Sequence, residues 1–264
     1  MKDRSQYKIA FFNDASHGRI ALAIHVEQTL FSEFVFHLFE NYIYFRCLLQ
    51  NAMRCLELFC GSKSVGKVLE AHGWEVISVD IDPETKPTIC CSIVDIPIDK
   101  WSPGYFDYVH ASPPCTAWSQ ARTTGPPIDW EAEKLISLHM MALINHLKPT
   151  AWTVENPATS KIWRLPWLCN LPFVTASYCQ YSNWGYRKNT RFACNLDWHP
   201  KVCKNDCVHV AKTALGRFRH KSTAQRGSRD NSDKFFSRKD LYRIPELLCE
   251  NMLQAVLCKV ATVR

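Results

Sequence analysis

A single cysteine directly after two prolines is the position in this chain where the residue types best suit covalent chemistry. An apolar run that begins at Val109 ends in Ser112-Pro113-Pro114-Cys115. Two consecutive prolines fix φ at about −65° and push the residue before each of them towards extended conformations, which makes a stiff turn. At the end of a buried strand, such a turn would direct the Cys115 thiol into a cleft as a nucleophile. The alternative is a cysteine that is only a small apolar filler.

A carboxylate occupies a comparable position further along the chain. Residues 151–154 predict a strand that ends in Glu155-Asn156-Pro157. If this strand lies in the same sheet, Glu155 faces the same cleft as Cys115 and can do acid–base work there. A solvated loop carboxylate is the alternative.

The elements that must position these residues predict an α/β fold. A buried strand over 54–60 is followed by Gly61-Ser62-Lys63-Ser64, a helical pattern over 68–72, and a second strand over 74–79 that ends at Asp80. This is the layout of a Rossmann-type cofactor site, in which an acid at the tip of the second strand binds ribose hydroxyls. Lys63 stands where another glycine is common, which argues against a pyrophosphate cradle and is compatible with S-adenosylmethionine.

Further elements complete a mostly parallel, Rossmann-like sheet with helices on both faces. Strands are expected over 88–93 and 105–109, and the second of these leads into Cys115. Ligands bind at the carboxyl ends of strands in open α/β sheets, so the cofactor loop and Cys115 meet at one edge. A helix is expected over 131–147, with a core stripe of Leu135, Leu138, Met141 and Ile144.

Composition narrows the class of protein. The chain has 264 residues, a net charge of +7 and 13 cysteines, an odd number. Charged residues run through the first thirty positions, so we expect no signal peptide and an intracellular, reducing compartment, the cytoplasm or nucleus. Charges also interrupt the aromatic and leucine-rich stretch 29–50, which predicts an amphipathic helix and no membrane span.

A basic, loop-rich segment follows the predicted sheet. Residues 199–243 hold twelve Lys and Arg against four acids, a local charge of +8. Such a segment is typical of phosphate contact and target recognition, and a solvated surface is the alternative. Within it, Cys203, Cys207 and His209 have the residue types of a structural zinc site, with Cys194, His199 and His220 nearby. The fourth ligand is undetermined, and plain thiols are the alternative.

Three of these motifs together resemble the cytosine-5 DNA methyltransferase family. They are Leu58-Phe59-Cys60-Gly61, Ser112-Pro113-Pro114-Cys115 and Val154-Glu155-Asn156-Pro157, in that order. The layout is similar to the small phage- or virus-type members with a reduced target-recognition region. The resemblance covers residues 54–195 well and the last twenty-five residues more weakly.

The resemblance implies the chemistry and the partners. Cys115 would add to carbon 6 of a flipped cytosine, Glu155 would contact ring nitrogen 3 and the exocyclic amine, and S-adenosylmethionine would supply the methyl group. Cysteine rather than an aromatic residue after Pro-Pro disfavours methylation of an exocyclic amine. DNA is the expected partner and RNA an alternative; a monomer is expected. A decayed member that only binds nucleic acid is a further alternative, because the glycine loop is altered.

The expected site residues follow from the same comparison. The family carries a glutamine and two arginines where this chain has residues 184–192; the glutamine is missing, and the basic candidates are Lys188 and Arg191. Gln120 and Arg122 are candidates for a loop that closes over the base. The expected cofactor contacts are Phe59, Gly61, Ser64, Asp80, Ile81, Asp95 and Pro113. The expected organisation is an N-terminal extension (1–52), a catalytic core (53–195), a basic Cys/His-bearing segment (196–240) and a C-terminal helix that returns to the core (241–264).

Overall fold

The computed structural model describes residues 10–14, 19–23, 52–120, 125–213, 215–224, 228 and 235–263. The chain divides into two units, Met1–Arg46 and Cys47–Arg264. In the first unit the described residues form an antiparallel hairpin of β1 (Ala10–Asp14) and β2 (Arg19–Ala23). The helix expected over 29–50 and the loop residue Arg122 lie outside the described residues.

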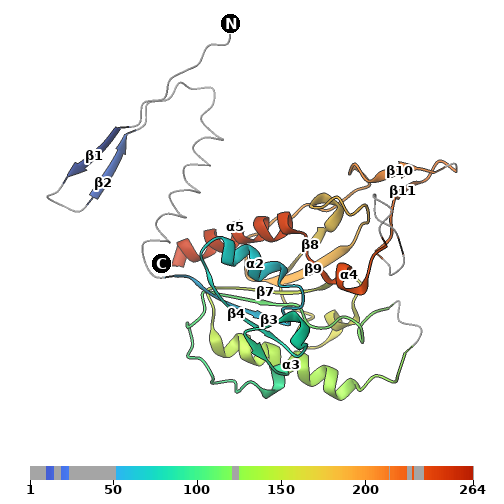
Figure 1. Ribbon diagram of the computed structural model, residues 1–264, viewed down its shortest axis with the longest axis horizontal. Coiled ribbons are helices and arrows are strands. Elements are labelled where there is room, and N and C mark those ends of the chain that lie inside the picture. Colours follow the sequence, from blue (N-terminus) through green and yellow to red (C-terminus); the bar gives the residue numbers. More distant parts are fainter. Residues whose placement is uncertain are drawn as a thin grey trace, which may run out of the picture. The chain divides into compact units, whose positions relative to one another are not determined.

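A seven-stranded sheet organises the second unit (Figure 1). Its order is β5-β4-β3-β6-β7-β9-β8; the first five strands run parallel, and β9 is antiparallel to both of its neighbours. The bounds are β3 (Arg54–Leu58), β4 (Glu75–Asp80), β5 (Ile89–Cys90), β6 (Tyr108–Ala111), β7 (Ala151–Pro157), β8 (Phe173–Ser177) and β9 (Asn189–Cys194). The prediction of an α/β fold with a mostly parallel sheet is confirmed.

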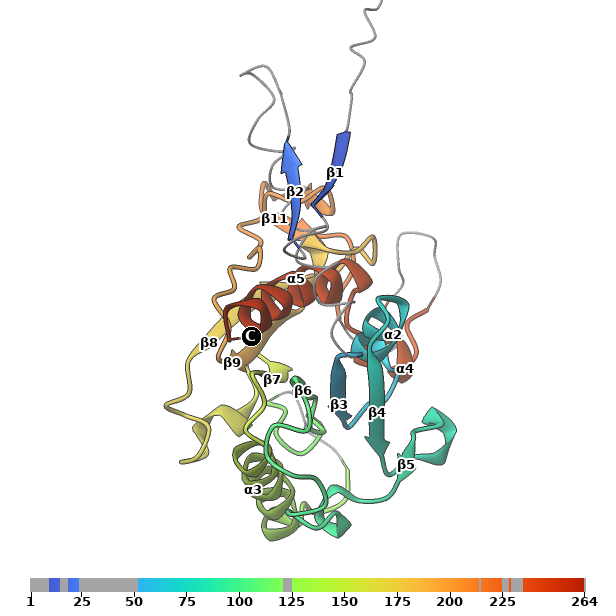
Figure 2. The same ribbon diagram turned by 90° about the vertical axis from the view of Figure 1, so that its left-hand side faces the viewer.

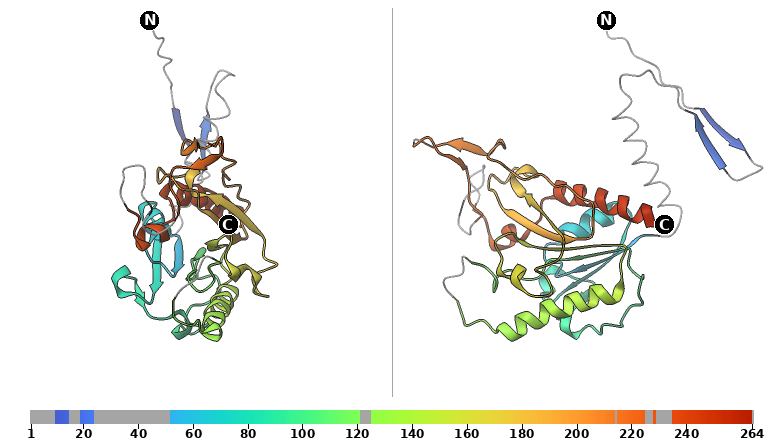
Figure 3. Two further views of the ribbon diagram at one scale, coloured as in Figure 1. Left: turned by 90° about the vertical axis from the view of Figure 1, so that its right-hand side faces the viewer. Right: turned by 180° about the vertical axis from the view of Figure 1, so that it is seen from behind.

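Helices cover both faces of this sheet. Helix α3 (Trp130–Leu147) lies on one face, and α2 (Ser64–Ala71) and α5 (Glu246–Val263) lie on the other, where they pack on each other (Figures 1 and 2). Helix α4 (Arg238–Tyr242) precedes α5. A separate hairpin, β10 (Val210–Lys212) and β11 (Phe218–His220), projects away from the sheet (Figure 3). Within the described ranges, none of the helices combines the length and apolar character needed to cross a bilayer.

The strand order places a topological switch point between β3 and β6. From β3 the chain moves outward through β4 to β5, and β6 and β7 then continue on the other side of β3. Ser112 N donates to Leu58 O at 3.2 Å, which ties the loop after β6 to the end of β3. In open α/β sheets ligands bind in the crevice at this point.

Two expected strands differ from those observed. Only Ile89 and Cys90 of the expected strand 88–93 pair with β4, and Ile93–Asp95 forms the 3₁₀ turn η2. The strand expected over 105–109 begins at Tyr108. Just before it, Asp107 N donates to Arg54 O and the Asp107 carboxylate accepts from Arg54 N.

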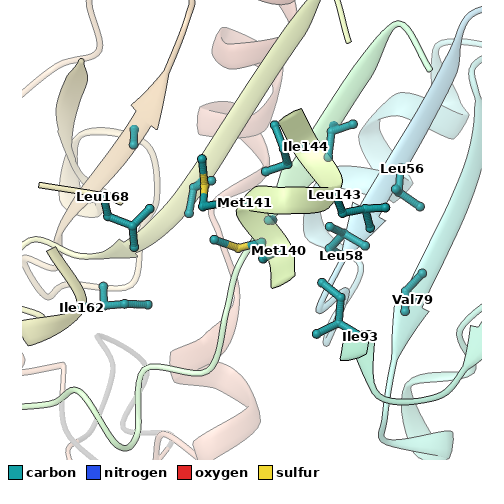
Figure 4. Close-up of a cluster of buried hydrophobic side chains, with 14 of the residues drawn as sticks. Leu56, Leu58, Val79, Ile93, Met140, Met141, Leu143, Ile144, Ile162 and Leu168 are labelled. Atoms are coloured by element: carbon teal, nitrogen blue, oxygen red, sulfur yellow. The ribbon is translucent and has the colours of Figure 1, made fainter. Parts of the chain in front are cut away.

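The core stripe expected on α3 is also partly wrong. Leu135 and Leu138 are 53% and 47% exposed, whereas Met140, Leu143 and Leu147 are fully buried. A step of three residues falls 60° short of a full turn, so a stripe with that spacing rotates off the core face within a few steps. Figure 4 shows Met140, Met141, Leu143 and Ile144 packed near Leu56 and Leu58 of β3.

A buried carboxylate lies beneath the loop that starts α2. Glu57 on β3 is 2% exposed. The backbone N–H groups of Gly66 and Val65 form weak hydrogen bonds with its carboxylate, and Oε2 has no partner of good geometry among the described residues. Burial raises the pKa of Glu57 to about 7, against these two hydrogen bonds, which lower it. Glu57 thus ties the first turn of α2 to the central strand.

Replacing Gly66 with alanine is expected to destabilise the protein, although alanine is the better helix former. A Cβ at Gly66 would overlap Glu57 Oε2 and lie 3.4 Å from Val76 Cγ1. The overlap should cost about 1–3 kcal/mol and outweigh a gain in helix propensity of about 1 kcal/mol. Urea unfolding measures the difference, and Lys67→Ala, at the exposed neighbouring position, is the matched control. An unchanged free energy of unfolding for Gly66→Ala would show that Glu57 does not constrain this helix.

Candidate active site

The turn formed by residues 112–115 leaves β6 at the switch point and is fixed from β7. Asn156 Nδ2 donates to Pro113 O at 2.8 Å. Pro113 is buried, Pro114 is exposed, and Cys115 is half-buried. The Cys115 thiol is therefore partly open to solvent at the carboxyl edge of the sheet.

Glu155 is buried beside this turn, near the end of β7. The Tyr178 hydroxyl donates to Glu155 Oε1 at 3.4 Å, and the Ser112 side chain also bonds to the carboxylate. Burial raises the pKa of Glu155, and Lys188, Tyr178 and Ser112 oppose this shift. Glu155 consequently keeps its proton to a higher pH than an ordinary glutamate does.

Lys188 supplies the positive charge of the site. Its Nζ lies 4.8 Å from the centroid of the Tyr178 ring and donates to Leu241 O at 3.0 Å. Burial raises the pKa of Cys115, the charge of Lys188 lowers it, and Glu155 raises it. Lys188 thus favours both the Cys115 thiolate and the Glu155 carboxylate, while burial favours their neutral forms.

The Arg191 side chain lies on the face of the sheet opposite to that of Glu155. It pairs with Asn156, whereas Phe192 pairs with Glu155, so Arg191 and Glu155 point to opposite sides of the sheet. The Arg191 guanidinium stacks on Phe173, 3.8 Å from the ring centroid. Of the two basic candidates, the structure brings Lys188 to Cys115 and Glu155, and it packs Arg191 among aromatic rings.

A buried polar chain beneath the site is absent from the sequence prediction. Hydrogen bonds link Tyr108 Oη to Thr153 Oγ1 at 2.6 Å, Thr153 Oγ1 to His110 Nδ1 at 2.7 Å, and His110 Nε2 to Ser112 Oγ at 2.9 Å. Burial lowers the pKa of His110 to about 3, so the imidazole is neutral. The chain orients Ser112, which bonds to Glu155. Polar residues at alternate positions of β6, Tyr108 and His110, were the available signal.

The expected cofactor loop is held by its acid. Gly61 N donates to Asp80 Oδ2 at 2.8 Å, and Asp82 N donates to Asp80 Oδ1 at 2.9 Å. Phe59 and Lys63 adopt left-handed φ of 57° and 54°, as does Gly61 at 47°. This backbone wraps tightly around the end of β3, and Asp80 fixes it.

The other expected cofactor residues lie along the same edge. Ile81, directly after β4, is 71% exposed, and Asp95 is exposed at the end of η2. Ser64 begins α2, and Pro113 lies in the turn before Cys115.

The segment of residues 241–244 touches three parts of the site. Leu241 O accepts from Lys188, the Tyr242 hydroxyl lies 3.4 Å from Thr116 Oγ1, and Ile244 N donates to Ser64 Oγ at 3.1 Å. The segment therefore joins the cysteine turn, the basic residue and the cofactor loop.

The expected metal ligands are only partly brought together. Cys203 and Cys207 lie with Cys179 and His220, and the four ligand atoms are all within 4.8 Å of one another. His209 is directed elsewhere, with its Nε2 2.9 Å from Ser182 O. This Cys3His cluster has the ligand types and number that could bind zinc.

Comparisons with solved structures give only distant similarity. The Dnmt2 methyltransferase of S. pombe matches with 16% identity and a TM-score of 0.42, over 58% of this chain and 54% of that one. A SAM dependent methyltransferase from Archaeoglobus fulgidus matches with 16% identity and a TM-score of 0.30, over 48% of this chain and 58% of that one.

Sequence comparison is more informative. No family model matches the chain. A protein of Frog virus 3 (isolate Goorha), described as a probable DNA (cytosine-5)-methyltransferase, is 30% identical over 223 residues, which cover 76% of this chain and 99% of that protein. With that identity over almost the whole of the viral protein, the chain belongs to the cytosine-5 DNA methyltransferase family.

Proposed function

We propose that this chain transfers a methyl group from S-adenosylmethionine to carbon 5 of cytosine in DNA, through a covalent adduct with Cys115. One observation supports this above all: the half-buried Cys115 shares its electrostatic environment with Glu155 and Lys188 at the switch point of the sheet. The Frog virus 3 relative, a probable DNA (cytosine-5)-methyltransferase, supports the choice of substrate.

The residues present fit S-adenosylmethionine, which has no phosphates to bind. The loop after β3 offers a tight backbone rather than a glycine-rich cradle, Asp80 retains lone pairs for ribose hydroxyls, and Ile81 offers an exposed apolar face for a ring. Asp95 is placed to accept from an exocyclic amine. When bound, the sulfonium group supplies an electrophilic methyl.

In the proposed reaction the Cys115 thiolate forms a bond to carbon 6 of a flipped cytosine. The electron pair of the 5,6 double bond moves to carbon 5, and Glu155 gives a proton to ring nitrogen 3. Carbon 5 then takes the methyl group, and S-adenosylhomocysteine leaves with the electron pair of the broken bond. A base removes the proton from carbon 5, the 5,6 double bond re-forms as the Cys115 thiolate is expelled, and ring nitrogen 3 returns its proton to Glu155.

A methyl-transfer assay with matched substrates tests the proposal. We expect the full chain to transfer labelled methyl groups to duplex DNA, with the label in 5-methylcytosine. DNA that contains 5-fluorocytosine should trap the enzyme, because fluorine cannot leave carbon 5 as a proton does. Transfer to RNA but not DNA would contradict the proposed substrate. No transfer to either, with no binding of S-adenosylmethionine in calorimetry, would contradict the activity itself.

Replacing Lys188 with methionine is expected to slow methyl transfer about 10- to 100-fold, because the cation that lowers the pKa of Cys115 is lost. The rate of Cys115 alkylation by iodoacetamide should fall at the same pH, and its rise with pH should move to higher pH. Lys188→Arg, which keeps the charge, should retain most of the alkylation rate. If Cys115 in the Lys188→Met protein is alkylated at the same rate as in the unaltered protein, Lys188 does not act on the thiol.

A further inference from the structure

A cluster of three cysteines and one histidine lies outside the proposed catalytic machinery. Cys179 belongs to the 3₁₀ turn η4 (Tyr178–Gln180), Cys203 and Cys207 to the loop that follows residue 200, and His220 to the end of β11. These positions span more than forty residues of chain and three separate elements. We propose that these four side chains bind one structural zinc ion.

The geometry of the cluster fits a tetrahedral ion. Cys203 Sγ lies 3.5 Å and Cys207 Sγ 3.2 Å from His220 Nε2. With Zn–S bonds of about 2.3 Å and Zn–N bonds of about 2.0–2.1 Å, a tetrahedron has S···N edges of about 3.6 Å. The observed separations are thus close to those that zinc requires, before any ion draws the ligands together.

The ligand set is closed, as in structural rather than catalytic sites. Cys179 and Cys203 are buried, and Cys207 and His220 are half-buried. Four protein ligands leave no open position for water or substrate. The site would therefore hold the fold together.

The surroundings of Cys203 suit a metal-bound thiolate. The backbone N–H groups of Asn205, Asp206 and Cys207 are directed towards the Cys203 sulfur. Asn205 adopts a left-handed φ of 67°, which turns the chain back around that sulfur. Such N–H donors to a ligand are the outer-shell contacts that orient thiolates at metal sites.

The segment that carries three of the ligands has little apolar packing of its own. Val202, Val208, Leu215 and Phe218 are all exposed, at 44%, 82%, 84% and 60%. The β10–β11 hairpin has only two strands of three residues, and an isolated two-stranded hairpin is marginally stable in water. A zinc ion would cross-link this segment and stabilise it in place of a hydrophobic core, as in other small metal-stabilised units.

The cluster also lies next to the active site. Cys179 directly follows Tyr178, whose hydroxyl donates to Glu155. Ser222, two residues after His220, donates its N–H to Gly185 O. Zinc would thus anchor the basic segment to the short turn that contacts the catalytic carboxylate. This last consequence rests on the proposed function, whereas the metal site does not.

Metal analysis of the full chain tests the site without reference to activity. We expect about one zinc per chain in protein purified under reducing conditions without chelator. Substitution with cobalt should give the visible absorption of a tetrahedral ion and the sulfur-to-cobalt charge-transfer band of a three-thiolate site. Absence of both signals would overturn the proposal, as would a disulfide between two of the three cysteines in freshly purified protein.

Variants identify the ligands. Cys207→Ser and His220→Ala should each lower zinc affinity by more than about 100-fold, since even an outer-shell partner is worth 10- to 100-fold. His209→Gln and Cys194→Ser, which change nearby residues outside the cluster, should keep a full zinc ion. Loss of zinc in His209→Gln with retention in His220→Ala would overturn the ligand set. If a ligand variant fails to fold, the cobalt spectrum of the unaltered protein still decides the number of thiolates.

Discussion

Replacing Cys115 with serine is expected to abolish methyl transfer, with a loss of at least about 10³-fold. A serine hydroxyl is not ionised near neutral pH and is a far weaker nucleophile than a thiolate, so addition to carbon 6 of the cytosine would fail. Serine is close to cysteine in size, and the Cys115 side chain is half-buried, so the substitution should disturb the packing of the turn little. S-adenosylmethionine binding should therefore persist. Single-turnover methylation, trapping on 5-fluorocytosine DNA and calorimetry measure the three properties separately.

The matched control is Cys169→Ser. Cys169 is exposed, its Sγ donates to Pro166 O at 3.6 Å, and it lies far along the chain from the cysteine turn. It should methylate and trap like the unaltered protein. A Cys115→Ser protein that retains full activity would refute the covalent mechanism. One that loses cofactor binding as well would show that the substitution acts on the fold and not on the chemistry.

Replacing Glu155 with glutamine is expected to lower kcat about 10²- to 10³-fold while leaving cofactor binding unchanged. Glutamine keeps the shape and some hydrogen bonds of the side chain but cannot give a proton to ring nitrogen 3. Because burial raises the pKa of Glu155, the protonated form persists to a higher pH than in an ordinary glutamate. The rate of the unaltered enzyme should therefore fall as pH rises through that pKa, and this fall should be absent in Glu155→Gln.

A pH profile of single-turnover rates checks this prediction. Glu131→Gln changes a surface carboxylate that pairs only with Lys134 within α3, and it is the matched control. It should leave both the rate and the profile unaltered. If the rate of the Glu155→Gln protein still falls at high pH, the fall must be due to another group.

The fold class could be predicted because it depends on strand ends and periodicity. The strand-loop-helix-strand pattern from residue 54 to Asp80 and the Pro-Pro turn placed the sheet edge where the structure has it. Cys115 follows the buried strand β6 and Glu155 lies near the end of β7, so the parallel pairing of these two strands brings them to the same edge. Their catalytic roles remain predictions.

The remainder depends on tertiary packing that sequence spacing does not encode. Lys188 and Arg191 lie three residues apart in one basic stretch, but Lys188 precedes β9, whereas Arg191 lies within β9 and is turned away from Glu155 by the register of β9 against β7. Cys179 lies 24 residues before Cys203 in another element, so the spacing around Cys203 pointed to His209 instead. The prediction that Leu135 and Leu138 are buried was wrong because residues spaced by three do not stay on one face of a helix.

The contacts of residues 241–244 have a consequence for the order of events during synthesis. Ser64, Thr116 and Lys188 emerge from the ribosome long before Leu241, Tyr242 and Ile244, which hold them. The cofactor loop and the cysteine turn therefore gain these partners only after residues 241–244 have been made. A ribosome-bound chain that stops before residue 241 should have its sheet strands but an unfinished active site, so catalytic competence would have to wait for this segment.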